Sequence, residues 1–436
     1  MPHTLKDVLP ATAKLRDDGH LEVGGCDLVE LAAEFGTPLY VFCEETFRRQ
    51  ARRYREAFPP PDRVYYAAKA FSSLAAFAMA TDEGLGVDCA TGGELFVALK
   101  AGVPAESVIV HGNNKSDAEL EMAVTAGAGR IAVDSLDELE RLARIAETAG
   151  IRQRIVLRVT PGVEAHTHEY IQTGQEDTKF GMSISSGSAL EAAKRAADLP
   201  SLELAGAHAH IGSQIFGPEA FGKLVEIMCE FLADVRAATG AELGELNLGG
   251  GLGIAYTKEE APADVAAHAR YVRDAVAAEA AKHGLPVPVL SVEPGRSIVG
   301  NAMVTVYSVG VVKEIPAIRT YVSVDGGMSD NIRPMLYGAR YSALVANKAN
   351  EPSERVVTVA GSHCESGDVL LRDVALPASV ARGDLLAILA TGAYGYAMAS
   401  NYNKMPRPPV VAVRDGAARV VVRRETFEDL VRLDHT

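Results

Sequence analysis

A repeated alternation of short apolar segments and longer helical stretches runs from about residue 62 to residue 295 and constrains the fold more than any other sequence feature. The helical stretches are rich in Ala, Leu and Glu, as in 92–101, 135–149 and 218–238. The apolar segments are short and often β-branched, and they span 64–68, 86–89, 107–111, 130–134, 154–160, 204–211, 245–248 and 287–293. Strands that alternate with helices form right-handed parallel units. Eight such units predict a closed (β/α)8 TIM-type barrel.

The character of the sequence changes after Ile298. Valine-rich segments at 304–312, 321–324, 356–359 and 418–423 are joined by turns rich in Gly, Pro and Asp, which is typical of a mostly antiparallel β domain. Two strand-like pieces, 21–23 and 39–42, precede the barrel, and we expect them to pair with the C-terminal sheet. The predicted fold class is α/β plus all-β. The barrel would span 48–298, and a β-sandwich or β-barrel domain would combine 1–47 with 299–436.

Charge and hydropathy narrow the possible partners. The net charge is −14, whereas nucleic-acid-binding proteins usually present a basic stripe. No apolar run reaches the ~18 residues that a membrane helix needs, and the first residues lack the charged and apolar segments of a signal peptide. We therefore expect neither nucleic acid nor membrane as a partner.

The cysteines favour a reduced cytoplasm. Their number is odd and none has metal-ligand spacing, so no metal site is expected from them; they are Cys26, Cys43, Cys89, Cys229 and Cys364.

The predicted barrel places polar residues at the carboxyl ends of its strands, where barrel enzymes carry their active sites. Gly249, Gly250 and Gly251 follow the seventh strand, and successive glycines let an anion approach backbone N–H groups. Barrels often bind phosphate at the loops after strands 7 and 8. Gly295 and Arg296 follow the eighth strand, and Ser213 follows the sixth. A tight turn without a ligand is the alternative, but the combination favours a phosphate site.

Two further residues point to a specific cofactor. Lys69 ends the first strand, where apolar surroundings would lower the pKa of its amine and favour a Schiff base, although a lysine at a strand end is often only a surface charge. Glu293 ends the eighth strand, and a buried carboxylate needs a partner such as a protonated pyridine nitrogen. Phosphate, lysine and carboxylate together match pyridoxal 5'-phosphate. His210 would stack on the ring, unless it is a core histidine.

A zinc site is the alternative from another class of enzyme. His208 and His210 lie two residues apart on one strand, and His166 and His168 repeat that spacing. Two such pairs inside a barrel would suit a metal-dependent hydrolase. That interpretation gives no role to the glycine run, to Lys69 or to Glu293.

These motifs resemble the pyridoxal-phosphate decarboxylases of the alanine-racemase fold (fold type III), and within that group the diaminopimelate decarboxylases. The similarity extends from Gly36 to Thr426. The matching motifs are 65–70, 91–95, 111–115, 162–174, 210–214, 249–253, 293–296, 325–338, 364–368 and 392–394. The departures are small: Ala209 stands where cysteine or serine is common, and the pair at 362–363 is one of several variants.

The resemblance implies a role for each matching residue. Lys69, Cys364 and His210 would be catalytic, with Lys69 bonded to the cofactor and Cys364 donating a proton. The cofactor would be held by Lys69, Asp88, His210, Ser213, Gly249, Gly250, Gly251, Glu293, Gly295, Arg296 and Tyr394. Substrate would be bound by Arg296, Arg333, Tyr337, Glu365 and Tyr394. The resemblance also implies a homodimer whose two chains share their active sites.

The choice of substrate has its own physical argument. Arg333 and Tyr337 suit a carboxylate at the far end of an amino acid, since arginine grips carboxylates bidentately. Glu365 would meet a far-end ammonium group. Both requirements are met by meso-2,6-diaminopimelate, whose decarboxylation yields L-lysine and CO2. A decarboxylase for another amino acid stays open, and so does a structural ion pair at Arg333. A non-enzymatic cofactor carrier is disfavoured because it would not need Cys364 and Tyr394.

Overall fold

The computed structural model describes residues 5–162 and 178–435, which divide into two compact units. The barrel unit comprises Ala51–Gly253 and Ala263–Gly295, and the β unit comprises Met1–Gln50, Ile254–Pro262 and Arg296–Thr436. The predicted boundaries at 48 and 298 lie close to these limits. The segment Ile254–Pro262, which the sequence pattern places inside the barrel, packs with the β unit instead.

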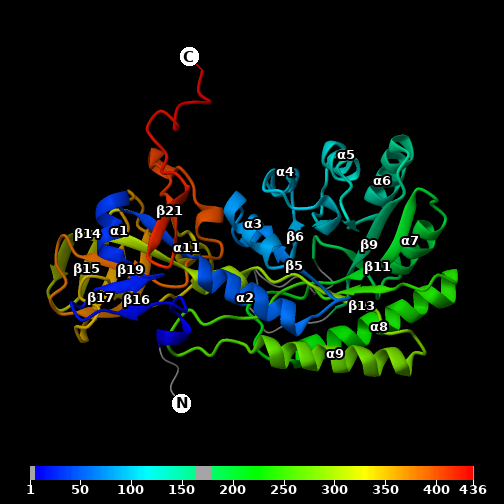
Figure 1. The fold of residues 1–436 in the computed structure, drawn as a ribbon, viewed down its shortest axis with the longest axis horizontal. Helices are drawn as coiled ribbons and strands as arrows, with labels where there is room; N and C mark the ends of the chain where they lie inside the picture. The colour runs from blue at the N-terminus through cyan, green and yellow to red at the C-terminus, as the bar shows by residue number, and fades with distance from the viewer. Residues whose placement is uncertain (1–4, 163–177, 436) are drawn as a thin grey trace. The chain divides into compact units, whose positions relative to one another are not determined.

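Within the described residues, eight parallel strands form the barrel sheet, as the repeat predicts. Figure 1 shows helices packed around the strands of this unit. The sheet closes because the last strand pairs with the first, with Ser291 beside Arg63 and Val292 beside Val64. A short extra strand, β10 (Met182–Ser183), adds to β9. The barrel strands are β5 (Arg63–Ala67), β6 (Gly86–Cys89), β7 (Val108–Val110), β8 (Arg130–Val133), β9 (Gln153–Thr160), β11 (Leu202–His208), β12 (Glu245–Asn247) and β13 (Val289–Val292).

Helices follow the strands, and most begin at a residue whose side chain caps the helix. Ser73, Thr91 and Ser135 each accept a backbone N–H of the first turn, and Ser116 forms a reciprocal capping box with Glu119. Such caps fix the point where each loop ends. The helices are α3 (Leu74–Asp82), α4 (Gly92–Lys100), α5 (Asp117–Ala126), α6 (Leu136–Ala149), α7 (Ser188–Ala197), α8 (Glu219–Thr239) and α9 (Val265–Lys282).

The β unit is built on a sheet in the order β18-β17-β15-β14-β4-β20-β21, and β19 pairs with both β14 and β16. Most pairings are antiparallel, as predicted, but β15 with β17 and β4 with β20 are parallel. Its strands are β4 (Leu39–Cys43), β14 (Met303–Ile315), β15 (Arg319–Val324), β16 (Ala343–Val345), β17 (Ser353–Ala360), β18 (Val369–Pro377), β19 (Leu385–Ile388), β20 (Val410–Arg414) and β21 (Ala417–Val422).

The N-terminal strands follow the prediction only in part. β4 pairs with β14 and β20 inside the large sheet, so the expectation for 39–42 is confirmed. The expectation for 21–23 is wrong, because β2 (Leu21–Val23) lies between β1 (Lys14–Leu15) and β3 (Cys26–Asp27) in a separate three-stranded sheet. The tight turn at Gly24 and Gly25, both with positive φ, folds β3 back onto β2 and occupies that edge.

The helices α2 (Glu44–Ala57) and α1 (Leu28–Phe35) connect these N-terminal strands to one another and to the barrel. None of the helices in residues 5–162 and 178–435 is both long and apolar enough to cross a membrane.

Candidate active site

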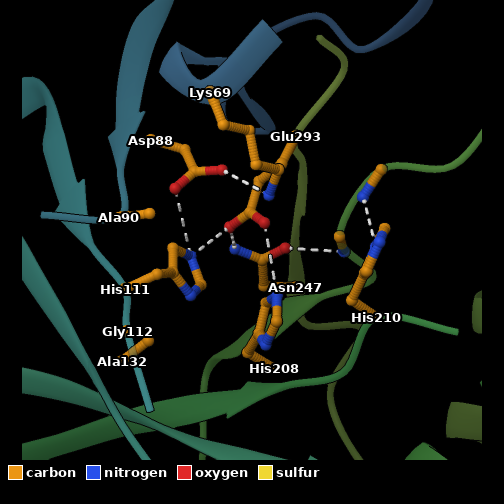
Figure 2. Close-up of polar contacts among 12 residues, drawn as sticks. Lys69, Asp88, Ala90, His111, Gly112, Ala132, His208, His210, Asn247 and Glu293 are labelled. Atoms are coloured by element: carbon orange, nitrogen blue, oxygen red, sulfur yellow. Dashed lines mark hydrogen bonds and ion pairs between the residues drawn. The ribbon is translucent and has the colours of Figure 1, made fainter. Parts of the chain in front are cut away.

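A buried carboxylate, Glu293, lies directly after the last barrel strand and accepts three hydrogen bonds (Figure 2). Its oxygens accept from His111 Nε2 at 2.7 Å, from Asn247 Nδ2 at 2.7 Å and from His208 Nε2 at 3.2 Å. These three donors come from the ends of β7, β12 and β11. The carboxylate is therefore fixed by side chains from three other strands.

The protonation of this cluster follows from its surroundings. Burial alone would raise the pKa of Glu293, but the imidazoles of His111 and His208 outweigh it and hold that pKa well below its ordinary value. Burial lowers the pKa of His208 to about 4, so this ring is neutral at physiological pH. Glu293 is thus an ionised carboxylate, which is the form that can pair with a protonated ring nitrogen.

Lys69 and Asp88 form the second part of the barrel site. Lys69 lies in a 3-10 turn after β5, and its Nζ is 3.5 Å from Asp88 Oδ2. The side chain of Lys69 is 46% exposed, whereas that of Asp88 is 1% exposed. Neither oxygen of Asp88 accepts a hydrogen bond within the part of the chain that the structure describes. The amine therefore stands beside a buried carboxylate on a partly exposed side chain, which differs from the apolar setting expected for it.

The glycine run after β12 is tightly packed against the neighbouring loops. A Cβ on Gly250 would lie 2.3 Å from the carbonyl oxygen of Glu293, and one on Gly251 would lie 2.4 Å from that of Gly212. Gly249 and Gly251 also have positive φ values, +66° and +116°. Only glycine fits such positions without displacing the backbone.

Two N–H groups of the run already have acceptors within the protein. The N–H of Gly249 donates to Asn247 Oδ1 at 2.9 Å, and the N–H of Gly250 donates to His210 Nδ1 at 3.2 Å. A neutral imidazole that accepts at Nδ1 carries its hydrogen on Nε2. Burial lowers the pKa of His210 well below its ordinary value, so the ring is neutral. Ser213 is half-buried in the loop after β11.

Gly295 follows Glu293 by two residues and packs against the first barrel strand. A Cβ at this position would lie 3.0 Å from the Cβ atoms of both Ala67 and Ala70. This close approach leaves little room for a side chain and brings the loop after β13 next to the turn that carries Lys69.

The β unit contains a cluster of two buried arginines, two buried tyrosines and the half-buried Tyr394. Arg296 opens α10 (Arg296–Val299), and Arg333 opens α11 (Arg333–Tyr337). Arg296 Nη1 donates to Tyr256 Oη at 2.5 Å, and Arg333 Nη1 donates to Tyr341 Oη at 2.5 Å. The guanidinium of Arg296 also lies 4.9 Å from the ring centroid of Tyr394. Two cations are thus held by phenols and ring faces.

The loop between β17 and β18 carries Cys364 and Glu365. Cys364 is exposed, whereas Asp368 at the end of the loop is buried. The carboxylate of Asp368 accepts the N–H of His363 at 2.9 Å and that of Met328 at 2.7 Å, which ties the loop to the segment before α11. The thiol is therefore presented to solvent on an anchored loop.

The residues predicted from sequence thus fall into two groups. Lys69, Asp88, His210 and Glu293 come together in the barrel unit with the glycine run. Arg296, Arg333 and Tyr394 come together in the β unit, and Tyr337, half-buried at the end of α11, lies on the same helix as Arg333.

Sequence reasoning gave no role to four residues that the structure brings into these clusters. Asn247 and His111 hold Glu293, and Tyr256 and Tyr341 hold the arginines. A usable signal existed for Asn247 and His111, since both end barrel strands. Tyr256 had none, because its segment was assigned to the barrel.

The two described histidines of the alternative zinc site have different hydrogen-bond partners. His208 bonds Glu293, whereas His210 bonds the backbone of Gly250, so the two imidazoles do not share a target. His166 and His168 lie outside the described residues.

An ion pair between Lys115 and Glu138 anchors the turn that follows His111. Lys115 Nζ donates to Glu138 Oε1 at 2.7 Å and to the carbonyls of Gly112 and Ala132 at 2.7 and 2.8 Å. Both side chains are at most 3% exposed. Burial lowers the pKa of Lys115 and raises that of Glu138, so desolvation outweighs their attraction.

Lys115→Met should therefore destabilise the protein by about 3–5 kcal/mol, because it leaves the Glu138 carboxylate buried without a partner. The double variant Lys115→Met/Glu138→Leu should recover most of this loss, since it removes both buried charges. The shift of the urea unfolding midpoint measures both effects. Additive losses in the double variant would show that the two side chains do not act as a pair.

The chain is similar to known proteins over nearly its whole length. The family described as "Pyridoxal-dependent decarboxylase, pyridoxal binding domain" matches residues 44–300. The diaminopimelate decarboxylase of Halalkalibacterium halodurans is 50% identical over 426 residues, covering 97% of each chain. That of Bacillus subtilis is 46% identical over 429 residues, covering 98% of each chain. The structure of the M. jannaschii enzyme in complex with L-lysine superposes with a TM-score of 0.91 at 34% identity, covering 98% of each chain.

Proposed function

Since this chain belongs to the pyridoxal-dependent decarboxylases, and within them to the diaminopimelate decarboxylase family, we propose a role for each residue of the two clusters in that reaction. The activity is that of a carboxy-lyase, which uses pyridoxal phosphate to convert meso-2,6-diaminopimelate to L-lysine and CO2 in lysine biosynthesis. The metal-dependent hydrolase is thereby set aside.

The side chains that meet in the barrel unit, Lys69, Asp88, His210 and Glu293, have the chemical groups that pyridoxal phosphate requires. Glu293 is an ionised carboxylate held by three donors and would keep the ring nitrogen protonated. Lys69 would bond the cofactor covalently, with Asp88 beside it and the neutral ring of His210 against the cofactor. Bound pyridoxal phosphate supplies an electron sink for the carbanion that remains after loss of CO2.

The phosphate would be held at the loops after β11, β12 and β13. The proposed residues are Ser213, Gly249, Gly250, Gly251, Gly295, Arg296 and Tyr394.

The proposed substrate specificity rests on one observation, which is that the guanidinium of Arg333 is buried. Its surroundings are phenols, and its Nε has no hydrogen-bond partner among the described residues. A carboxylate at the far end of the substrate would supply that partner. Arg296, Tyr337 and Tyr394 would assist, and Glu365 would meet the far-end ammonium group.

Cys364 would donate the proton that replaces the lost carboxylate. Its exposed thiol lies on a β-unit loop anchored by Asp368, and the exposed apolar side chain of Met335 lies close to that loop at Gly367. Apolar side chains exposed next to a catalytic loop favour an interface. We therefore propose a homodimer in which the Cys364 loop of one chain completes the site of the other.

We further propose that the domains have distinct roles. Residues 48–298 would bind the cofactor, and residues 1–47 with 299–436 would supply the substrate-binding side chains and the dimer contacts. All five cysteines are free thiols, which fits a location in the cytoplasm.

The proposed substrate is tested by a panel of amino acids. Purified enzyme with pyridoxal phosphate should release CO2 from meso-diaminopimelate and much less from L-lysine, L-ornithine and L-arginine, which lack a far-end carboxylate. Faster release from one of those three would overturn the substrate assignment while leaving the decarboxylase family intact.

Arg333→Ala should lower kcat/KM for meso-diaminopimelate by about 10²- to 10³-fold, the scale of a lost buried charge pair. The absorbance of the bound cofactor should not change, because Arg333 is proposed to contact substrate alone. Arg340→Ala, which removes an exposed arginine from the same segment, is the matched control and should keep full activity. Loss of cofactor from the Arg333 variant would mean that this arginine is structural.

A further inference from the structure

The cluster around Tyr256 poses a problem of charge. Arg333 is 6% exposed, and the groups that act on its charge are the phenols of Tyr256, Tyr341 and Tyr394. Within residues 5–162 and 178–435 no carboxylate forms an ion pair with it, and its Nε lacks a hydrogen-bond partner. A buried cation without a counter-ion costs free energy. An open donor on such a cation points to an anionic ligand.

Tyr256 touches both arginines of the cluster. Its hydroxyl accepts from Arg296 Nη1 at 2.5 Å, and its ring centroid lies 5.0 Å from the guanidinium of Arg333. The ring of Tyr341 packs edge-on against that of Tyr256, with the two ring centroids 5.1 Å apart and an interplanar angle of 83°. Both guanidiniums are thus oriented by one side chain.

The backbone of Tyr256 is fixed on both sides. Its N–H and that of Thr257 donate to Glu260 Oε2 at 2.7 and 3.0 Å, and its carbonyl accepts from the N–H of Ser342 at 3.0 Å. These contacts lie within the segment Ile254–Pro262, which leaves the barrel unit and packs with the β unit. This packing places the side chain of Tyr256 next to the two arginines.

The chemical type of the side chain matters here. A phenol accepts a hydrogen bond and offers a ring face, but it brings no full negative charge when protonated. An aspartate or glutamate at this position would orient the arginines equally well and would also neutralise them. A tyrosine orients the two guanidiniums and leaves the positive charge of Arg333 available to a ligand.

We propose that Tyr256 is a positioning residue for substrate specificity, which orients Arg296 and Arg333 so that they grip the far-end carboxylate of the substrate. This inference rests on the proposed function, since it assumes that Arg333 binds that carboxylate. Tyr341 supports the same arrangement, because its hydroxyl accepts a hydrogen bond from Arg333 Nη1.

The test compares two ligands that differ in one carboxylate. L-lysine keeps the far-end carboxylate of the substrate, whereas cadaverine has the same carbon chain and both amines but no carboxylate. In Tyr256→Phe, which keeps the ring and removes the hydroxyl, the inhibition constant of L-lysine should rise about tenfold, the scale of one hydrogen bond to a charged group. That of cadaverine should change less than about twofold. KM for meso-diaminopimelate should rise with little change in kcat, as expected for lost uniform binding.

Tyr307→Phe is the matched control, because it also removes a buried hydroxyl from the β unit, at a site outside the cluster. It should change neither inhibition constant. Tyr341→Phe is a second variant, and it should repeat the selective loss of L-lysine binding even if Tyr256→Phe does not fold.

The outcomes separate the two proposals. Unchanged L-lysine binding in the Tyr256 and Tyr341 variants, or an equal loss of both ligands, would overturn the positioning role alone. Equal binding of L-lysine and cadaverine by the unaltered enzyme would instead overturn the far-end carboxylate site, and with it the proposed substrate contacts.

Discussion

Lys69→Ala should be nearly inactive, with kcat reduced by at least the roughly 10²–10⁴-fold that a single acid–base group contributes. The expected loss is larger because this amine is proposed to form the covalent bond to the cofactor and to exchange with the substrate amine. Its partly exposed side chain, beside the buried carboxylate of Asp88, suits that exchange. Turnover of meso-diaminopimelate measures the loss.

The site of attachment has a direct test. Borohydride treatment of the unaltered enzyme should fix the cofactor to the peptide that contains Lys69, as seen by mass spectrometry. Lys100→Ala, at the exposed end of α4, should leave both labelling and activity unchanged. A label on another lysine, or an enzyme that gains nothing from added pyridoxal phosphate, would refute the assignment of Lys69.

Mixing two inactive variants should restore activity. Lys69→Ala and Cys364→Ala chains should each be nearly inactive, but unfolding and refolding them together in equal amounts should recover about a quarter of the wild-type activity. The reason is that half of the dimers are mixed, and each mixed dimer has one intact site if the Cys364 loop serves the partner's cofactor.

The double variant Lys69→Ala/Cys364→Ala gives the reciprocal control. Refolded with an equal amount of unaltered chains, it should leave about a quarter of the activity, because both sites of every mixed dimer are defective. If each site belonged to one chain, this mixture would keep about half and the first mixture would stay inactive. That pattern would contradict the shared site.

The strands of the barrel could be predicted from sequence because their signal is local. The predicted and observed bounds agree for β6 (Gly86–Cys89), a short segment between two helical stretches. The sixth strand was predicted at 204–211, but β11 spans Leu202–His208, so His210 lies in the loop that contacts the glycine run. The polar residues near the end of this strand do not indicate where its backbone hydrogen bonds to the neighbouring strands end.

The contacts inside the site depend on long-range geometry and could not be predicted in the same way. The position of Glu293 at a strand end was readable, but its bonds to His111 and Asn247 require the closed barrel. Tyr256 was missed because its neighbours along the chain are barrel residues, whereas its contacts lie in the β unit. The periodicity of apolar residues predicts helices and strands, but it does not predict which domain an irregular segment packs against.

The pairing of β13 with β5 has a consequence for how the protein matures. Lys69 follows the first strand of the barrel and Glu293 follows the last, so the two residues become neighbours only when those strands meet. Contacts so distant in the chain form late, because the entropy of closing a long loop must first be overcome. A nascent chain that has not yet produced β13 has the lysine but lacks the carboxylate. Stable loading of the cofactor should therefore mark the end of barrel folding, which makes the colour of the enzyme a kinetic probe of its last folding step.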